Sequence, residues 1–172
     1  MKILLFNPRA LKYKPRIPNS VLQVAASIDG IYDWVIVDGN LEADPWPKLE
    51  AYLLTGEYGC FGCTVMPGPQ LKQAIPMSKK IRRMFPNVKI VWGGYFASNQ
   101  YKACLDSGYV DYIVNGPGDT AFPALLNSIK DRRDPESIKN LIFKSNGEVV
   151  KTAKEDLPDL DKLPPLPYEK LN

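Results

Sequence analysis

Two stretches decide the fold, Val88-Lys-Ile-Val-Trp-Gly-Gly94 and Val110-Asp-Tyr-Ile-Val-Asn-Gly-Pro-Gly-Asp119. Each is a short apolar, β-branched segment that ends in glycines and is followed by a helical pattern. In a parallel sheet, the carboxyl ends of the strands form the rim where ligands bind. Because glycine carries no side chain, the two stretches predict a rim at which a ligand can approach the backbone closely.

The rest of the chain alternates the same two patterns. Continuous apolar runs predict strands, and apolar residues at helical spacing predict helices between them. Pro76 lies inside one helical pattern, where we expect it to kink the helix or to mark a late start. The predicted strands are 2–6, 34–37, 58–65, 88–92 and 110–114, and the predicted helices are 21–30, 45–54, 70–85, 101–108 and 120–129.

Five β-α repeats with short connections predict right-handed crossovers and helices on both faces of a parallel sheet. We therefore expect an α/β, doubly wound, flavodoxin-like or Rossmann-like domain over residues 1–131, with five strands in the order 2-1-3-4-5. Residues 132–157 predict a small β-hairpin, because Ser145-Asn-Gly147 suits a type I′ turn. Residues 158–172 are rich in proline and are interpreted as an extended linker to a further domain.

Composition narrows the function classes. The 172 residues carry 22 basic and 19 acidic side chains, a net charge of +3 that is spread along the chain. This predicts no broad nucleic-acid surface, and the basic cluster at 79–83 is interpreted as a solvated helix face. No apolar run approaches the roughly 20 residues of a membrane span. Together with an odd number of cysteines in apolar settings, this favours a cytoplasmic protein without disulfides.

The chain contains no histidine. This excludes Ser-His and Cys-His nucleophiles and removes the most common metal ligand. Cys60-Phe-Gly-Cys63 is a C-x-x-C string, but it lies within a predicted strand and has no second cysteine pair to complete a zinc site. Core packing is therefore favoured over redox or metal chemistry for Cys60 and Cys63, and also for Cys104. We predict no catalytic and no metal-ligating residue.

Two other functions of this fold can be tested against the residues. A phospho-receiver domain needs an acidic pair after strand one, an aspartate after strand three and a lysine after strand five. Here those places hold Asn7-Pro8, Met66 and Asn115. A flavodoxin needs a small, backbone-rich phosphate loop after strand one, and the loop here is bulky and broken by prolines. Neither function is supported.

The chain resembles the N-terminal cobalamin (vitamin B12)-binding domain of cobalamin-dependent radical S-adenosylmethionine enzymes. The resemblance covers nearly the whole chain and rests on an ordered set of strings rather than on one of them. The strings are Lys2-Ile-Leu-Leu-Phe-Asn-Pro8, Pro18-Asn-Ser-Val-Leu-Gln-Val-Ala-Ala26, Val37-Asp-Gly-Asn40, Gly62-Cys-Thr-Val-Met-Pro-Gly-Pro-Gln70, Val91-Trp-Gly-Gly94, the stretch 110–119 and Leu163-Pro-Pro-Leu-Pro-Tyr168.

The resemblance implies that cobalamin lies on the carboxyl rim of the sheet, with its nucleotide tail inserted near strands one, three and four. Thr64 and Met66 would border the tail, Gly93 and Gly94 would let it pass, and Asp119 would accept hydrogen bonds from amides. The full set of cofactor-binding residues that it implies is Asn7, Pro8, Ser20, Thr64, Val65, Met66, Gly68, Gly93, Gly94, Tyr95, Asn115, Gly116, Pro117, Gly118 and Asp119.

The sequence also departs from the related domains. Their Asp-x-His-x-x-Gly loop, whose histidine ligates cobalt, is replaced by Asn7-Pro-Arg-Ala10. If cobalamin binds, its base is displaced from cobalt and no protein imidazole replaces it. The Cys-x-x-x-Cys-x-x-Cys motif of the iron-sulfur cluster is missing, so S-adenosylmethionine and the 4Fe-4S cluster are expected only in a downstream radical domain. This chain by itself is therefore expected to be non-catalytic.

We expect a cobalamin-binding module of a radical S-adenosylmethionine enzyme that transfers methyl groups or performs related C–C bond chemistry. Its partners would be cobalamin and its own radical domain, and neither nucleic acid nor a membrane. The alternative is a cofactor-free domain of the same fold that contacts substrate or another domain. Taken singly, the glycine pairs also fit simple turns, Thr64 a capping role, and Asp119 the N-cap of a helix.

Overall fold

The computed structural model describes residues 1–11, 13, 16–157 and 159–171. Within them the chain forms one seven-stranded sheet in the order β2-β1-β3-β4-β5-β6-β7. The first five strands in sequence are parallel, and the last two are antiparallel. Their bounds are β1 (Lys2–Asn7), β2 (Trp34–Asp38), β3 (Tyr58–Thr64), β4 (Lys89–Gly93), β5 (Tyr112–Val114), β6 (Leu141–Ser145) and β7 (Glu148–Lys151).

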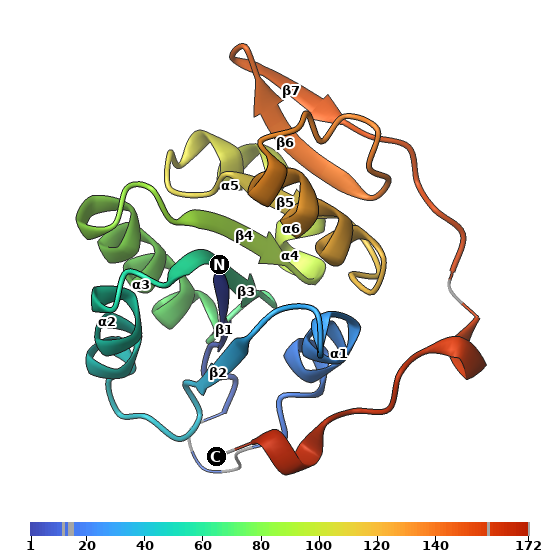
Figure 1. Cartoon of the computed structure of the whole chain (residues 1–172). Coiled ribbons are helices and arrows are strands. Elements are labelled where there is room, and N and C mark those ends of the chain that lie inside the picture. Colours follow the sequence, from blue (N-terminus) through green and yellow to red (C-terminus); the bar gives the residue numbers. More distant parts are fainter. Residues whose placement is uncertain (12, 14–15, 158, 172) are drawn as a thin grey trace.

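The predicted α/β class and the order of the five parallel strands are confirmed. The sheet has seven strands rather than five, because β6 pairs with β5 and so joins the hairpin to the same sheet (Figure 1). The hairpin turn has positive φ at Asn146 and Gly147, the backbone that a type I′ turn requires. The boundary expected at residue 131 stays a prediction.

Helices cover both faces of the sheet. One face carries α1 (Asn19–Ile28) and α6 (Ala121–Asp131), which bury Ala25, Ile28 and Leu125 against it. The other face carries α2 (Trp46–Leu54), α3 (Leu71–Met84), the short α4 (Tyr95–Asn99) and α5 (Tyr101–Asp106). Each face has its own apolar core, so side chains that alternate along a strand enter different cores.

The helix α3 runs without a break across Pro76, and it starts five residues before that proline. A proline has no N–H, so it leaves the carbonyl four residues earlier without its usual intrahelical donor. Both Lys72 and Pro76 are exposed, which allows water to satisfy that carbonyl. The late start considered from the sequence therefore does not occur.

The residues after β7 turn back along the domain. They contain two short 3-10 turns, η1 (Leu160–Lys162) and η2 (Tyr168–Lys170), and run past α1 toward the β2 side of the sheet (Figure 1). Lys170 forms an ion pair with Asp29, at the end of α1, at 2.7 Å. Residues 158 and 172 of the expected linker lie outside the described residues. Among the helices of the described part, none combines the length and the apolar character needed to cross a bilayer.

Candidate functional site

A cavity of about 260 Å³ lies between α1 and the carboxyl ends of the central strands. Its walls are mostly apolar, and it opens toward the rim that the glycine stretches predict. The helix α1 supplies one wall, the strands supply the opposite wall, and the turn before α6 closes one end. The lining residues are Ser20, Val21, Gln23, Val24, Leu5, Gly62, Cys63, Thr64, Val91, Gly93, Gly94, Val114, Gly116, Gly118, Asp119 and Phe122.

Because Gly93 has no side chain, it leaves space in this cavity that no other protein atom fills. Its φ is not positive, so its backbone conformation does not require glycine. A Cβ built at Gly93 would meet only Val114, at 4.0 Å, so no atom of the protein excludes a side chain there. Gly62, by contrast, is required by packing, because its Cβ would lie 2.8 Å from Leu5. The glycine at position 93 therefore keeps a wall of the cavity open rather than completing a turn.

Gly94 and Gly116 are required by the backbone. Their φ angles are +90° and +132°, values that side chains rarely adopt. At Gly94 a Cβ would also lie 2.9 Å from the backbone oxygen of Val65. At these two positions, the simple role in a turn that the sequence left open accounts for the glycine.

Polar side chains line part of the cavity. Ser20 donates a long hydrogen bond, of 3.4 Å, to the hydroxyl of Thr64, so α1 and the end of β3 meet there. Within the described part of the chain, Gln23 Nε2 and Asp119 Oδ1 are buried atoms without a hydrogen-bond partner. The N-cap of α6 is Thr120, so Asp119 does not take the capping role. Two unused polar atoms therefore border the same cavity.

The chain after β7 holds the turn at residues 115–119 in place. The Lys154 ammonium donates to the carbonyl of Asn115, and the Thr120 hydroxyl donates to the carboxylate of Glu155. Asn140 links both segments: its carbonyl accepts from the Asn115 N–H at 2.7 Å, and its side chain accepts from the Glu155 N–H at 3.1 Å. We call residues 152–155 the strap. The strap holds one end of the cavity through the side chains of Lys154 and Glu155.

The structure brings seven of the predicted site residues into the lining: Ser20, Thr64, Gly93, Gly94, Gly116, Gly118 and Asp119. Four others are buried supports just behind the rim. Asn7 donates to Asp38 at 2.8 Å, and the carbonyl of Pro8 accepts from Gln70 at 3.0 Å. Val65 is fully buried, and Asn115 is 6% exposed.

The remaining predicted residues lie on the rim outside the cavity. Met66 and Tyr95 lie two residues after the ends of β3 and β4, and they are exposed by 49% and 64%. Gly68 is exposed with positive φ, and Pro117 is half-buried in the turn before α6. Two apolar side chains thus project beside the mouth of the cavity, where a ligand larger than the cavity would extend.

Reasoning from the sequence missed Gln23, Phe122 and the strap. Gln23 lies in a helical stripe that predicts only core packing, and Phe122 lies in the helix after the turn. Lys154 and Glu155 follow a hairpin that gave no sign of reaching the rim. The string Pro18-Asn-Ser-Val-Leu-Gln-Val-Ala-Ala26 did contain Gln23, and the polar residue between Leu22 and Val24 was the available signal.

Cys60 and Cys63 pack into the cores on opposite faces of the sheet. All three cysteines are free and buried, as predicted. Burial raises the pKa of the Cys60 and Cys63 thiols well above the usual range and raises the pKa of Cys104 to about 11. Since thiolates are the reactive form, these cysteines have structural roles.

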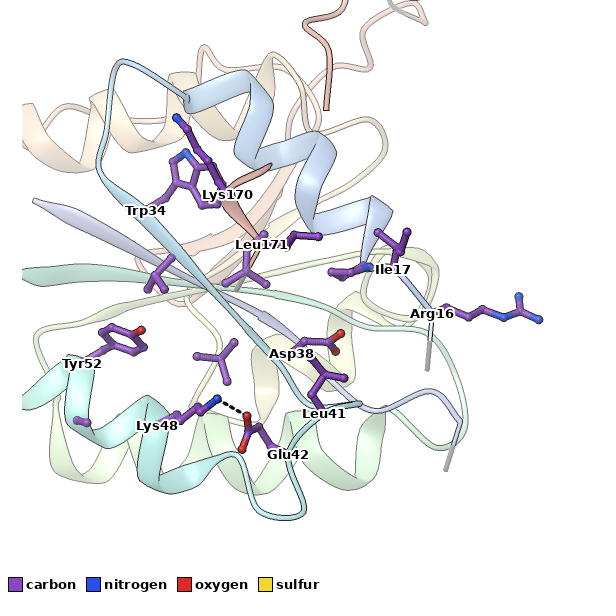
Figure 2. Close-up of a pocket in the computed structure, with 15 residues that line it drawn as sticks. Arg16, Ile17, Trp34, Asp38, Leu41, Glu42, Lys48, Tyr52, Lys170 and Leu171 are labelled. Atoms are coloured by element: carbon purple, nitrogen blue, oxygen red, sulfur yellow. Dashed lines mark ion pairs between the residues drawn. The ribbon is translucent and has the colours of Figure 1, made fainter. Parts of the chain in front are cut away.

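A larger groove, of about 690 Å³, runs along the edge strand β2 (Figure 2). Trp34 and Lys170 lie at one end of it, while an ion pair between Lys48 and Glu42 lies on the α2 side. None of the predicted site residues lines this groove. It is therefore a separate surface from the glycine rim.

The fold and the cavity define a class: an α/β domain with a parallel sheet and a mostly apolar cavity between its first helix and its glycine rim. The model of the B12 binding domain family matches residues 15–126, and the chain belongs to this family. This confirms the resemblance stated from the sequence. No curated protein is similar enough in sequence to count as a match.

Solved structures share the fold at low sequence identity. TsrM from Kitasatospora setae, a radical S-adenosylmethionine methyltransferase with cobalamin and a [4Fe-4S] cluster bound, has a TM-score of 0.75 and 22% identity over 89% of this chain and 31% of TsrM. OxsB, a cobalamin-dependent S-adenosylmethionine radical enzyme with aqua-cobalamin bound, has a TM-score of 0.79 and 16% identity over 91% of this chain and 22% of OxsB. The chain thus spans about a third or less of their length.

The receiver domain of RcsB from Escherichia coli is a more distant likeness, with a TM-score of 0.53 and 19% identity over 77% of this chain and 95% of that domain. The likeness reflects the shared flavodoxin-like sheet. The residues at the receiver positions, Asn7, Met66 and Asn115, are not the acidic and lysine residues that phosphorylation requires.

Proposed function

We propose that this chain is the cobalamin-binding module of a larger radical S-adenosylmethionine enzyme, and that the nucleotide tail of cobalamin enters the cavity between α1 and the sheet. The observation that carries the proposal is Gly93, which leaves space that neither backbone geometry nor protein packing explains. The flat, largely apolar base of the tail matches the apolar walls. The match to the B12-binding family supports the same ligand.

The size of the cavity supports insertion of the tail alone. Pockets that enclose a whole drug-sized ligand measure roughly 300–1,000 Å³. At about 260 Å³, this cavity holds one end of a larger molecule. The corrin ring would then lie outside, beside the exposed Met66 and Tyr95. When bound, cobalamin would supply a cobalt centre that carries a methyl group or exchanges electrons.

The absence of histidine supports a proposal for the lower face of cobalt. A base inserted between α1 and the sheet cannot also ligate the metal, and the chain has no imidazole to replace it. The cofactor would therefore be held with its base off cobalt, and this chain would supply no histidine ligand. The loop 7–10 that replaces the histidine loop instead supports the rim, because Arg9 donates to the carbonyl of Gly39 at 3.0 Å.

The parent reaction is methyl transfer or related radical C–C bond chemistry, for which S-adenosylmethionine and a 4Fe-4S cluster would be held by another domain. Residues 158–172 would form the linker to that domain. The low coverage of TsrM and OxsB, both much longer than this chain, supports a modular arrangement.

The second candidate is a cofactor-free interaction domain. The groove along β2 favours it, since an edge strand flanked by Trp34 and Tyr52 offers a surface for another chain or for substrate. The two candidates differ in whether the glycine cavity has a ligand.

The test is to mix the purified protein with hydroxocobalamin and separate it by gel filtration. We expect corrin absorbance to elute with the protein at a ratio near one. After reduction to cob(II)alamin, electron paramagnetic resonance should show no nitrogen splitting from an axial base. Protein that elutes without corrin would contradict cobalamin binding and favour the second candidate. Bound corrin with nitrogen splitting would contradict the base-off arrangement.

A further inference from the structure

Buried polar atoms without a partner are concentrated at the cavity. In residues 1–11, 13, 16–157 and 159–171, three such side-chain atoms occur: Gln23 Nε2, Arg82 Nε and Asp119 Oδ1. Arg82 uses its other nitrogens, pairing with Asp111 and donating to the carbonyl of Pro86. Gln23 and Asp119 have no comparable substitute, and both line the cavity between α1 and the sheet.

Neither packing nor hydrogen bonding within the protein requires an amide side chain at position 23. Its neighbours along the wall of α1, Val21 and Val24, are apolar, and a residue such as methionine or leucine would fill the same place without a polar cost. An amide N–H that is buried without an acceptor destabilises the protein that carries it. Residues that lack partners in a folded protein are therefore candidates for contact with a ligand.

The donor on Gln23 defines the group that it can bind. An amide Nε2 only donates, so its partner must carry a lone pair. The nucleotide tail of cobalamin carries such acceptors at its buried end, namely the ring nitrogen that is free when the base is off cobalt, and the ribose oxygens. Of the other side chains of this wall, Val21 and Val24 cannot donate a hydrogen bond, and the Ser20 hydroxyl already donates to Thr64.

We infer that Gln23 donates a hydrogen bond to the nucleotide tail and makes the cavity selective for corrinoids that carry a complete tail. The inference rests on the proposed function. Asp119, in the turn that closes one end of the cavity, has the opposite chemistry, because its unpaired Oδ1 accepts hydrogen bonds from hydroxyl or amide groups. One donor and one acceptor thus face a tail that offers both kinds of group.

The test compares two ligands and two variants. Hydroxocobalamin has the tail, whereas cobinamide is the same corrin without the nucleotide. Gln23→Met removes the donor while keeping the length of the side chain, and Gln100→Met is the matched control, since Gln100 is exposed and does not line the cavity. Binding is measured by the change in corrin absorbance on titration, and thermal unfolding checks that each variant is folded.

We expect Gln23→Met to weaken cobalamin binding by about 5- to 150-fold, the effect of leaving a buried acceptor without its donor. Binding of cobinamide should stay within about twofold, and Gln100→Met should bind both ligands as the unmodified protein does.

Two results overturn the inference while the proposed function stands. In one, Gln23→Met binds cobalamin as tightly as the unmodified protein. In the other, it loses both ligands to the same extent, which would mean that Gln23 acts through the shape of α1. Failure of the unmodified protein to bind either corrinoid would overturn both proposals.

Discussion

At the level of single residues, two adjacent positions carry glycine for different physical reasons. Gly94 has a φ of +90° and is required by the backbone, whereas Gly93 has neither a special φ nor a close neighbour. The sequence predicts both as parts of a rim, because glycines after an apolar strand are visible in the pattern. Which of them leaves space for a ligand cannot be read from the pattern, since it depends on Val114 from the next strand. Gln23 was missed for the same reason: its lack of a partner is visible only once the helix is placed.

The contact between Trp92 and Ser78 ties α3 to the centre of the sheet. The indole of Trp92 donates to the Ser78 hydroxyl at 3.0 Å, and both residues are at most 1% exposed. Ser78→Ala leaves a buried N–H without an acceptor, and we expect it to lower the free energy of unfolding by about 1–3 kcal/mol. Urea unfolding measures this loss.

Ser27→Ala is the matched control for Ser78→Ala. Ser27 is half-buried in α1, and its hydroxyl donates only to the carbonyl of Val24 in the same helix. Its loss should change the free energy of unfolding by less than about 0.5 kcal/mol. Equal effects of the two substitutions would show that the hydrogen bond to Trp92 does not stabilise the core.

The cysteines give a second prediction at this scale. Burial raises the pKa of all three thiols, so they stay protonated at pH 8 in the folded protein. We expect a thiol reagent such as Ellman's reagent to react with them only as fast as the protein unfolds. Rapid reaction of two thiols in the native protein, or a disulfide between Cys60 and Cys63, would contradict their placement in opposite cores.

At the level of secondary-structure elements, the β6–β7 hairpin and the strap after it make contacts that the sequence does not predict. Ser145-Asn-Gly147 predicts the turn correctly, because type I′ turns have a strong local signal. The pairing of β6 with β5 and the contacts of the strap with the turn at 115–119 depend on tertiary packing, which a local pattern does not encode. The segment 158–172 was predicted from its prolines to be extended, whereas the structure has two 3-10 turns in it, and its return along α1 was not predicted.

The docking of that segment should depend on pH. The hydrogen bond from Lys170, and then the one from Trp34, lower the pKa of Asp29 below its ordinary value despite some desolvation. A lowered pKa in the folded state means that the contact stabilises docking above the ordinary pKa and is lost as the pH falls through the lowered value. We expect the backbone amide NMR signals of Lys170 and Leu171 to shift toward those of an undocked chain below about pH 4.

Two variants distinguish the loss of the Lys170–Asp29 ion pair from other effects of low pH on the protein. Lys170→Met removes the partner of Asp29, so its signals should be those of an undocked segment already at pH 6. Lys162→Met removes only the pair with Asp159 inside η1 and should leave docking unchanged. If the Leu171 signal of Lys170→Met at pH 6 equals that of the unmodified protein, the ion pair does not hold the segment.

At the scale of the whole molecule, strand order explains where the site lies. The order β2-β1-β3-β4-β5 places the ends of β3, β4 and β5 side by side, so that glycines 25 residues apart in sequence line one cavity. This much follows from the sequence, because parallel β-α repeats fix the side of the sheet on which strands end. The width of the cavity does not follow from it, since that width depends on how α1 and α6 pack on their face.

The most direct measurement of the central claim is a titration of hydroxocobalamin into the unmodified protein and Gly93→Leu. We expect Gly93→Leu to weaken binding at least about tenfold, because its side chain occupies the space of the tail, without lowering the melting temperature. Gly59→Ala, in the same sheet but beside the flexible Met1, should bind normally. Equal affinity of Gly93→Leu and the unmodified protein, or no binding by either, would contradict the account.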